Sequence, residues 1–241
     1  MSKESNNFWN EELSSGFYDE IYFEGVERQR GIRSLWHHLT FLKVSEYIES
    51  PNRHLDFACG PGTFLGNFSE RNSVGVDISS NQINFAKKKY KKSNYYDLDE
   101  FDFSEYKESF KLITVLGLFE FINDDEIDEL MKKFKYCLKK EGKIVVTTPN
   151  FSFTMEIMIK LLKLFTGVDY SGMYVNKFNK KKISEFKSKY IDFEIQDKKL
   201  LNIGVFFGII NFSFAKKIHK FIEAISQSRF GFLSIIVLEK R

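Results

Sequence analysis

Residues 54–63, HLDFACGPGT, carry the most informative pattern of the sequence. The first five of these residues have the composition of a short apolar strand, and Gly60-Pro61-Gly62 after Cys59 form a turn. Thr63 can then cap a short helix that extends to Glu70, because threonine is a good N-terminal cap. A strand, a glycine turn and a helix in succession predict the first unit of a parallel sheet with crossover helices.

The same alternation continues along the chain. We expect strands at residues 73–77, 94–97, 110–116 and 143–148, and helices at 26–48, 80–92 and 124–138. Several of these strands are apolar on both faces, which is typical of a sheet covered by helices on both sides. Further along, we expect helices at 151–165, 180–189 and 214–225, and an antiparallel pair of edge strands at 193–201 and 232–238.

The length of 241 residues favours a single domain spanning residues 1–241. Within it we expect an N-terminal helical arm or lid at residues 1–50. Two embellishments, at residues 151–190 and 201–231, are expected on the substrate side.

Composition limits the classes of partner. Lys and Arg number 36 and Asp and Glu 33, so the formal net charge is only +3, which gives no support to a nucleic-acid partner. Cys59 and Cys137 are too few for a disulfide framework, and this fits a reducing cytoplasm. The N-terminus lacks the features of a signal peptide, and no apolar run is long enough for a membrane span.

The glycine turn marks a binding site at the carboxyl ends of the strands. Asp77 ends the second expected strand, where a carboxylate accepts two hydrogen bonds from a ribose diol. Asp56 precedes Gly60 by four residues, and there it would repel a phosphate but suit a cationic ligand. We expect valine at Gly60 or Gly62 to abolish ligand binding, and Gly75→Ala to be much milder.

Residues 56–62, D-F-A-C-G-P-G, resemble motif I of the class I S-adenosylmethionine-dependent methyltransferases, D-x-G-x-G-x-G, with Ala58 in place of the first glycine. Three further segments resemble, in order, the acidic patch that meets the adenine, the segment after the fourth strand and the fifth strand of that family. They are residues 96–101, 116–122 and 142–150. The resemblance covers about residues 30 to 200.

The resemblance implies an α/β, Rossmann-like fold: a seven-stranded sheet in the order 3-2-1-4-5-7-6, with the seventh strand antiparallel and helices on both faces. It implies S-adenosyl-L-methionine as the cofactor and S-adenosyl-L-homocysteine as the product. We expect no metal, because two cysteines and four scattered histidines do not supply a set of ligands. The cofactor-binding residues that it implies are Asp56, Ala58, Gly60, Gly62, Asp77, Ile78, Asp97, Leu98 and Leu116.

Two places depart from the family pattern. Many members have Glu-His after the fourth strand, where this chain has Glu120-Phe121, and some show His-x-Asn-x-Phe where this chain has Tyr174 to Phe178. No catalytic histidine is therefore carried over. We expect Tyr174 or one of His37 and His38 to be the polar group nearest to the methyl, with Glu120 behind them, in O-methylation of a small-molecule, sugar or lipid-linked acceptor.

Alternatives stay open. A nucleotide-dependent oxidoreductase is opposed by Asp56, whereas a non-catalytic relative that binds cofactor is compatible with the missing histidines. The sequence does not favour nucleic-acid methylation, because it has neither the Asn/Asp-Pro-Pro-Tyr/Phe motif usual for that reaction nor a basic face. Lysine- and phenylalanine-rich stretches at residues 151–165 and 204–221 suggest contact with an anionic membrane or an anionic acceptor, although solvated helix faces explain the same lysines.

Overall fold

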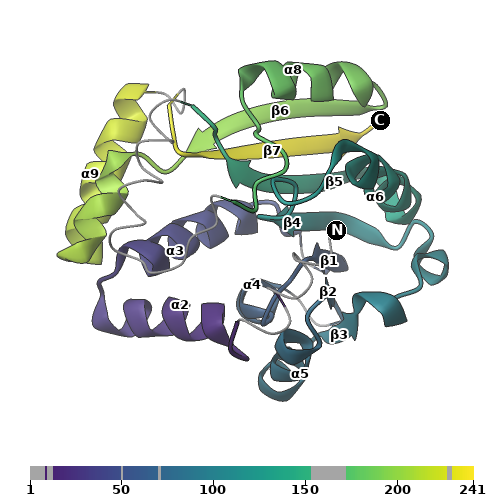
Figure 1. Cartoon of the computed structure of the whole chain (residues 1–241), viewed down its shortest axis with the longest axis horizontal. Coiled ribbons are helices and arrows are strands. Elements are labelled where there is room, and N and C mark those ends of the chain that lie inside the picture. Colours follow the sequence, from purple (N-terminus) through teal and green to yellow (C-terminus); the bar gives the residue numbers. More distant parts are fainter. Residues whose placement is uncertain (1–8, 10–12, 50, 70–71, 153–171, 227–229) are drawn as a thin grey trace.

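The computed structural model describes residue 9 and residues 13–49, 51–69, 72–152, 172–226 and 230–241. At its centre is a seven-stranded sheet (Figure 1) in the order β3-β2-β1-β4-β5-β7-β6. β1 to β5 run parallel, and β7 lies antiparallel between β5 and β6, which confirms the predicted topology. The strands are β1 (His54–Phe57), β2 (Val74–Asp77), β3 (Asn94–Asp97), β4 (Phe110–Leu116), β5 (Leu138–Pro149), β6 (Phe193–Leu200) and β7 (Leu233–Lys240).

Helices cover both faces of this sheet (Figure 1). One face carries α6 (Asp124–Cys137) and α8 (Lys180–Lys189). The other carries α3 (Ile32–Ser45), α4 (Thr63–Phe68), α9 (Phe212–Ser226) and the 3-10 helix η4 (Ile203–Ile209). The remaining helices are α2 (Phe17–Arg28), which packs on α3, α5 (Ser80–Lys89), which lies against β2 and β3, and the short 3-10 turns η2 (Leu98–Glu100) and η3 (Phe103–Tyr106). None of the helices described is both long enough and apolar enough to span a bilayer.

Alternation along the central strands builds the two apolar layers. In β4, Ile113 and Val115 belong to the layer under α6 and α8, whereas Leu112 belongs to the layer under α3 and α9. β5 divides in the same way, with Ile144 on the first face and Val145 on the second. Since successive side chains of a strand point to opposite faces, strands that are apolar throughout must be covered on both sides.

The expected helix at residues 26–48 is wrong in one respect. Two helices, α2 and α3, occupy this part of the chain, and they are separated where Gln29 and Gly31 take positive φ angles of 53° and 125°. The apolar period continues across the break, so the pattern alone merges the two helices. The expected helix at residues 151–165 lies outside the described residues, apart from its first two.

A buried carboxylate fastens α2 to the sheet domain. Asp19 of α2 is 2% exposed and accepts a hydrogen bond of 2.9 Å from the Thr63 hydroxyl at the start of α4. Tyr90 donates its hydroxyl to the same carboxylate, and Lys89 forms an ion pair with it. Three separate donors therefore meet on one side chain, and they hold the N-terminal helix across α4 and α5.

Replacing Asp19 by alanine should destabilise the protein by about 1–3 kcal/mol, because the hydroxyls of Thr63 and Tyr90 would be left without their acceptor. Glu20→Ala is the matched control, since the neighbouring Glu20 is exposed. Urea unfolding followed by circular dichroism measures both variants. Equal midpoints for the two would contradict the fastening role of Asp19.

Candidate functional site

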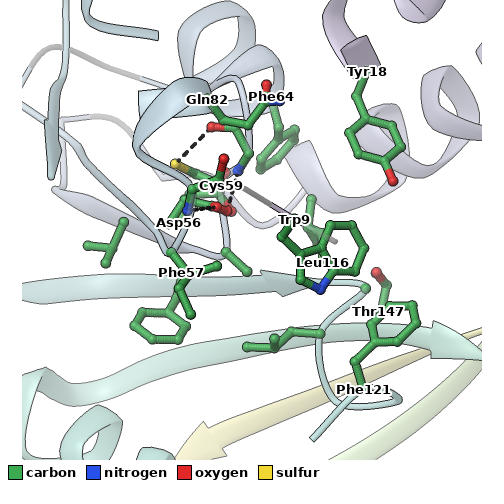
Figure 2. Close-up of a pocket in the computed structure, with 18 of the residues that line it drawn as sticks. Trp9, Tyr18, Asp56, Phe57, Cys59, Phe64, Gln82, Leu116, Phe121 and Thr147 are labelled. Atoms are coloured by element: carbon green, nitrogen blue, oxygen red, sulfur yellow. Dashed lines mark hydrogen bonds between the residues drawn. The ribbon is translucent and has the colours of Figure 1, made fainter. Parts of the chain in front are cut away.

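A cavity of about 830 Å³ opens at the carboxyl ends of β1, β2 and β4. It lies where the strand order turns between β1 and β4, the position at which open parallel sheets bind ligands. Figure 2 shows two unlike parts: acidic and amide groups near the β1 turn, and aromatic rings opposite. We call them the acidic half (Asp56, Gly60, Asp77, Ser79, Gln82, Leu98 and Asp99) and the aromatic half (Trp9, Tyr18, Trp36, His37, Phe41, Phe121 and Tyr174).

The turn after β1 is built from left-handed backbone. Ala58, Gly60 and Gly62 have φ angles of 62°, 53° and 74°. For alanine this conformation costs roughly 1–2 kcal/mol, which explains why glycine is the usual residue at the position of Ala58. The Cys59 amide donates to the Val76 carbonyl (3.0 Å) and the Gly60 amide to Asp77 Oδ2 (2.8 Å), so the turn is tied to the end of β2.

The three glycines near the turn have two kinds of surroundings. A Cβ added to Gly60 would meet nothing within 4 Å and would project into the cavity that Gly60 lines. At Gly62 a Cβ would stand 2.7 Å from the Tyr95 ring, so this glycine serves packing and does not line the cavity. Gly75 is equally crowded, at 2.6 Å from Tyr95 and 2.9 Å from Cys59 Sγ. Alanine at Gly75 would therefore require Tyr95 or Cys59 to shift, but Gly75 does not line the cavity, and its milder effect on ligand binding stays a prediction.

Asp56 is the buried end of a hydrogen-bonded chain. It is 1% exposed and accepts a bond of 2.6 Å from the Thr114 hydroxyl, which the parallel register places opposite it. His54 Nε2 lies 2.7 Å from the same hydroxyl, and Nδ1 of this imidazole contacts Ser69 Oγ. Burial lowers the pKa of His54 to about 3, so the ring is neutral. Because Thr114 gives its only hydroxyl proton to Asp56, the tautomer that suits this contact carries its proton on Nε2 and donates to Thr114.

Asp56 and Asp77 are the desolvated carboxyl groups of this half. Burial, with the nearby Asp77, raises the pKa of Asp56 to about 7, although the Thr114 bond opposes the shift. Burial also raises the pKa of Asp77, against the hydrogen bonds from the amides of Ser79 and Gly60. No described lysine or arginine forms an ion pair with either carboxylate. A desolvated pair of this kind favours a ligand that brings positive charge or hydroxyl donors.

The structure brings most of the expected cofactor residues to the cavity wall. Lining it are Asp56, Ala58, Gly60, Asp77, Ile78, Leu98 and Leu116. Asp97 is not part of the wall, whereas Asp99, two residues further, is. Cys59 also lines the cavity, and burial raises the pKa of its thiol well above the ordinary value, which does not suit a nucleophile.

Aromatic rings from distant segments meet in the other half. Trp9 packs edge-on against Phe121 at 5.4 Å between ring centroids, and Phe121 stacks on Tyr174 at 5.5 Å (Figure 2 shows Trp9 and Phe121). Tyr18 of α2 meets His37 of α3 at 5.9 Å. Sequence patterns did not single out Trp9 or Phe121 as wall residues, because each is an isolated aromatic whose placement depends on tertiary packing.

Glu120 is the buried acid of this region. It lines the cavity at 3% exposure, and its Oε2 has no hydrogen-bond partner in the described part of the chain. Burial raises its pKa to about 8. Its backbone carbonyl accepts the amides of Val175 (2.8 Å) and Asn176 (3.1 Å), which brings the Tyr174 segment beside it.

The two neighbouring histidines face different surroundings. His37 lines the cavity, and burial, with the charge of Arg33, lowers its pKa to about 4. His38 is not a wall residue: it lies between α2 and α9, 3.3 Å from the Tyr22 hydroxyl and 2.9 Å from Lys216 Nζ. Of the expected pair, only His37 therefore faces the cavity.

Comparisons with known proteins identify a family and similar folds. The family model described as a methyltransferase domain matches residues 27–192. A search among curated proteins found no match. Among solved structures, an S-adenosylmethionine-dependent methyltransferase from Archaeoglobus fulgidus is 20% identical, with a TM-score of 0.58 over 91% of this chain and 99% of that one.

Two further solved structures have a similar fold. Magnesium protoporphyrin IX methyltransferase from Synechocystis, with bound S-adenosylhomocysteine, is 13% identical, with a TM-score of 0.57 over 93% of this chain and 98% of that one. The plantazolicin methyltransferase BpumL, also bound to S-adenosylhomocysteine, is 16% identical, with a TM-score of 0.59 over 98% of this chain and 94% of that one.

The buried carboxyl of Glu120 should make stability depend on pH. The pKa of Glu120 in the folded protein is about 8, above the ordinary 4.5. The contribution of this carboxyl to the free energy of unfolding is therefore fully present below pH 4.5 and is lost as pH rises through about 8. Glu120→Gln cannot ionise. We expect the free energy of unfolding of the parent to fall relative to that of this variant between pH 5 and about 8. Urea titrations across that range measure the gap, and a constant gap would contradict the raised pKa.

Proposed function

The chain belongs to the class I S-adenosylmethionine-dependent methyltransferases, and from this premise we propose that it methylates a hydroxyl group of an apolar or amphiphilic small acceptor, free, sugar-borne or lipid-linked. The observation that carries the proposal is the aromatic half of the cavity, which adjoins the acidic half and holds the buried Glu120. Each half supports one part of the reaction.

The acidic half suits the cofactor. The unbalanced carboxylate of Asp56 can face an ammonium group, and the Asp77 oxygens keep lone pairs for a ribose diol after accepting the Gly60 and Ser79 amides. The open space above Gly60 admits a ligand against the backbone. Leu98 and Leu116 supply apolar walls. When bound, the cofactor supplies an electrophilic methyl group on a sulfonium.

The aromatic half suits the acceptor. Flat rings of Trp9, Phe121 and Tyr174 give an apolar surface, and Arg33 adds a positive charge to the wall formed by α3. The volume of about 830 Å³ lies toward the upper end of the roughly 300–1,000 Å³ typical of ligand sites. This size supports binding of a second small molecule beside a cofactor.

We assign the acid–base role to Glu120. An alcohol must lose its proton as it attacks the methyl group, and the ionised form of Glu120 accepts that proton. Because burial raises the pKa of this carboxyl to about 8, it then holds the proton near neutral pH. Tyr174 and His37, which line the same half, are assigned to orienting the acceptor hydroxyl. The lowered pKa of His37 keeps its ring neutral, so it can accept a hydrogen bond there.

A thermal-shift comparison tests the cofactor class. A ligand that binds only the folded state raises the unfolding temperature, so S-adenosylmethionine and S-adenosylhomocysteine should stabilise the protein and NAD(H) should not. Incubation with hydroxylated aromatic and long-chain acceptors should then release S-adenosylhomocysteine. Transfer to DNA, RNA or protein with none to small molecules would contradict the acceptor class.

Asp77→Ala should weaken binding of S-adenosylhomocysteine about 10- to 100-fold, because a charge-assisted hydrogen bond contributes about 1.5–3 kcal/mol. Asp125→Ala, an exposed carboxylate on α6 outside the cavity wall, is the control. Calorimetry with the 2′-deoxy analogue of S-adenosylhomocysteine distinguishes loss of the ribose hydrogen bonds from distortion of the turn after β1. The preference of the parent for the ribose form should shrink in Asp77→Ala, and an undiminished preference would contradict the assignment.

Asp56 should make cofactor affinity depend on pH. Since its carboxyl is protonated below about pH 7, an ammonium ligand must displace that proton on binding. Affinity should therefore rise by up to about tenfold per pH unit below pH 7 and level off above it. Asp56→Asn should flatten the profile, as measured by calorimetry in buffers of different ionisation enthalpy. Equal pH profiles for parent and variant would exclude Asp56 as the ammonium partner.

A further inference from the structure

η4 and α9 form a projecting unit at one end of the molecule, beside α2 and α3 (Figure 1). Its inner side is packed: Phe212 and Ala215 of α9 belong to the apolar layer over the sheet, and Gly208 of η4 lies against Leu35 of α3. The Gly31 amide donates to the Gly208 carbonyl at 2.7 Å. The unit therefore has a fixed orientation, with its outer side turned to solvent.

That outer side is apolar. Of the twelve large hydrophobic side chains that are exposed among the described residues, eight lie between Ile203 and Phe230. Phe214, Phe221 and Ile225 are 45%, 66% and 69% exposed and follow one another at seven- and four-residue spacing, so they form one stripe along α9. Five side chains make up what we call the α9 face: Ile209, Ile210, Phe214, Phe221 and Ile225.

The charge beside this face has one sign. Lys217 and Lys220 are exposed and flank the stripe on one side of the helix. Between Asp197 and Glu223 the sequence contains no acidic residue. The apolar stripe is therefore bordered by Lys217 and Lys220, while Glu223, the acidic residue of α9, lies on the opposite side of the helix near His219.

We propose that the α9 face docks on the surface of an anionic lipid bilayer, with α9 lying in the plane of the interface. An amphipathic helix that combines phenylalanine and isoleucine on one face with lysines at its border suits this location, since the rings enter the acyl boundary and the ammonium groups meet the headgroups. A second copy of the chain is a poorer occupant. A two-fold interface that packs the two α9 helices antiparallel through this stripe would bring the lysine border of one copy close to that of the other.

The inner side of α9, opposite the docked face, packs against α3, the helix that forms part of the cavity wall. Lys216 of α9 contacts His38 at 2.9 Å, and the Phe212 amide donates to the Gln29 carbonyl at 2.7 Å. His37, the neighbour of His38 on α3, lines the aromatic half. This step rests on the proposed function: an acceptor with an apolar tail would be presented at the interface close to the α3 wall.

Vesicle sedimentation tests the docking without any methyl acceptor. The parent protein should sediment with mixed phosphatidylcholine–phosphatidylglycerol vesicles and remain in solution with phosphatidylcholine alone. Phe221→Asp with Ile225→Asp, and separately Lys217→Glu with Lys220→Glu, should each weaken binding at least about tenfold. A Phe221→Trp variant should show a fluorescence blue shift, relative to the parent, on adding the anionic vesicles.

Matched controls lie on other surfaces. Ile191→Asp places the same kind of change at a side chain that is 70% exposed elsewhere, and Lys181→Glu with Lys187→Glu reverses two exposed charges on α8, on the opposite face of the sheet. These controls should bind vesicles as the parent does, and all variants should keep their calorimetric affinity for S-adenosylhomocysteine.

Three results would overturn the proposal. They are equal binding to neutral and anionic vesicles, unchanged binding in both α9 variants, and a parent dimer in light scattering that Phe221→Asp with Ile225→Asp converts to monomers. None of these results depends on turnover. A parent protein that does not bind S-adenosylhomocysteine would instead contradict the proposed function, and the vesicle result would still be valid.

Discussion

The hydrogen bond from the Gly60 amide to the Asp77 carboxylate is the contact on which the site depends. It joins the turn after β1 to the end of β2, and the bond from the Cys59 amide to Val76 supports it one residue earlier. The bond holds the Asp77 carboxylate beside the turn, and the left-handed backbone at Gly60 leaves open space above the Cα. Backbone geometry and the position of one carboxylate are thus fixed by the same interaction.

Burying the carboxyl groups of the acidic half costs electrostatic free energy. Removing Asp56 and Asp77 from water without a cation raises the pKa of both, and the Thr114 bond recovers only part of the cost for Asp56. His54, which contacts the Thr114 hydroxyl, is neutral. The hydrogen bonds from His54 through Thr114 therefore orient the Asp56 carboxyl without adding charge. Under the proposed function, a cationic ligand would complete this arrangement, and the local folding of the β1 turn would favour a sulfonium cofactor over a phosphate-bearing one.

Local features were predictable from the sequence, and long-range ones were not. The strand, turn and helix of residues 54–68 follow from residue types, whereas the strand order came from the family resemblance. The bonds of Thr114 to His54 and Asp56 depend on the register of strands about 60 residues apart. The third strand ends at Asp97 as expected, but Asp99 lines the cavity instead, because the turn η2 that follows the strand brings Asp99 to the wall. The break at Gly31 was hidden by a continuous apolar period.

A crystal structure of the protein with S-adenosylhomocysteine would show whether the two halves of the cavity divide cofactor from acceptor. We expect the ribose hydroxyls on the Asp77 carboxylate, the amino group on the side of Asp56, and the sulfur facing Glu120 and the aromatic half. An adenosine bound among Trp9, Phe121 and Tyr174, or a ligand that leaves Asp77 without contact, would contradict this division.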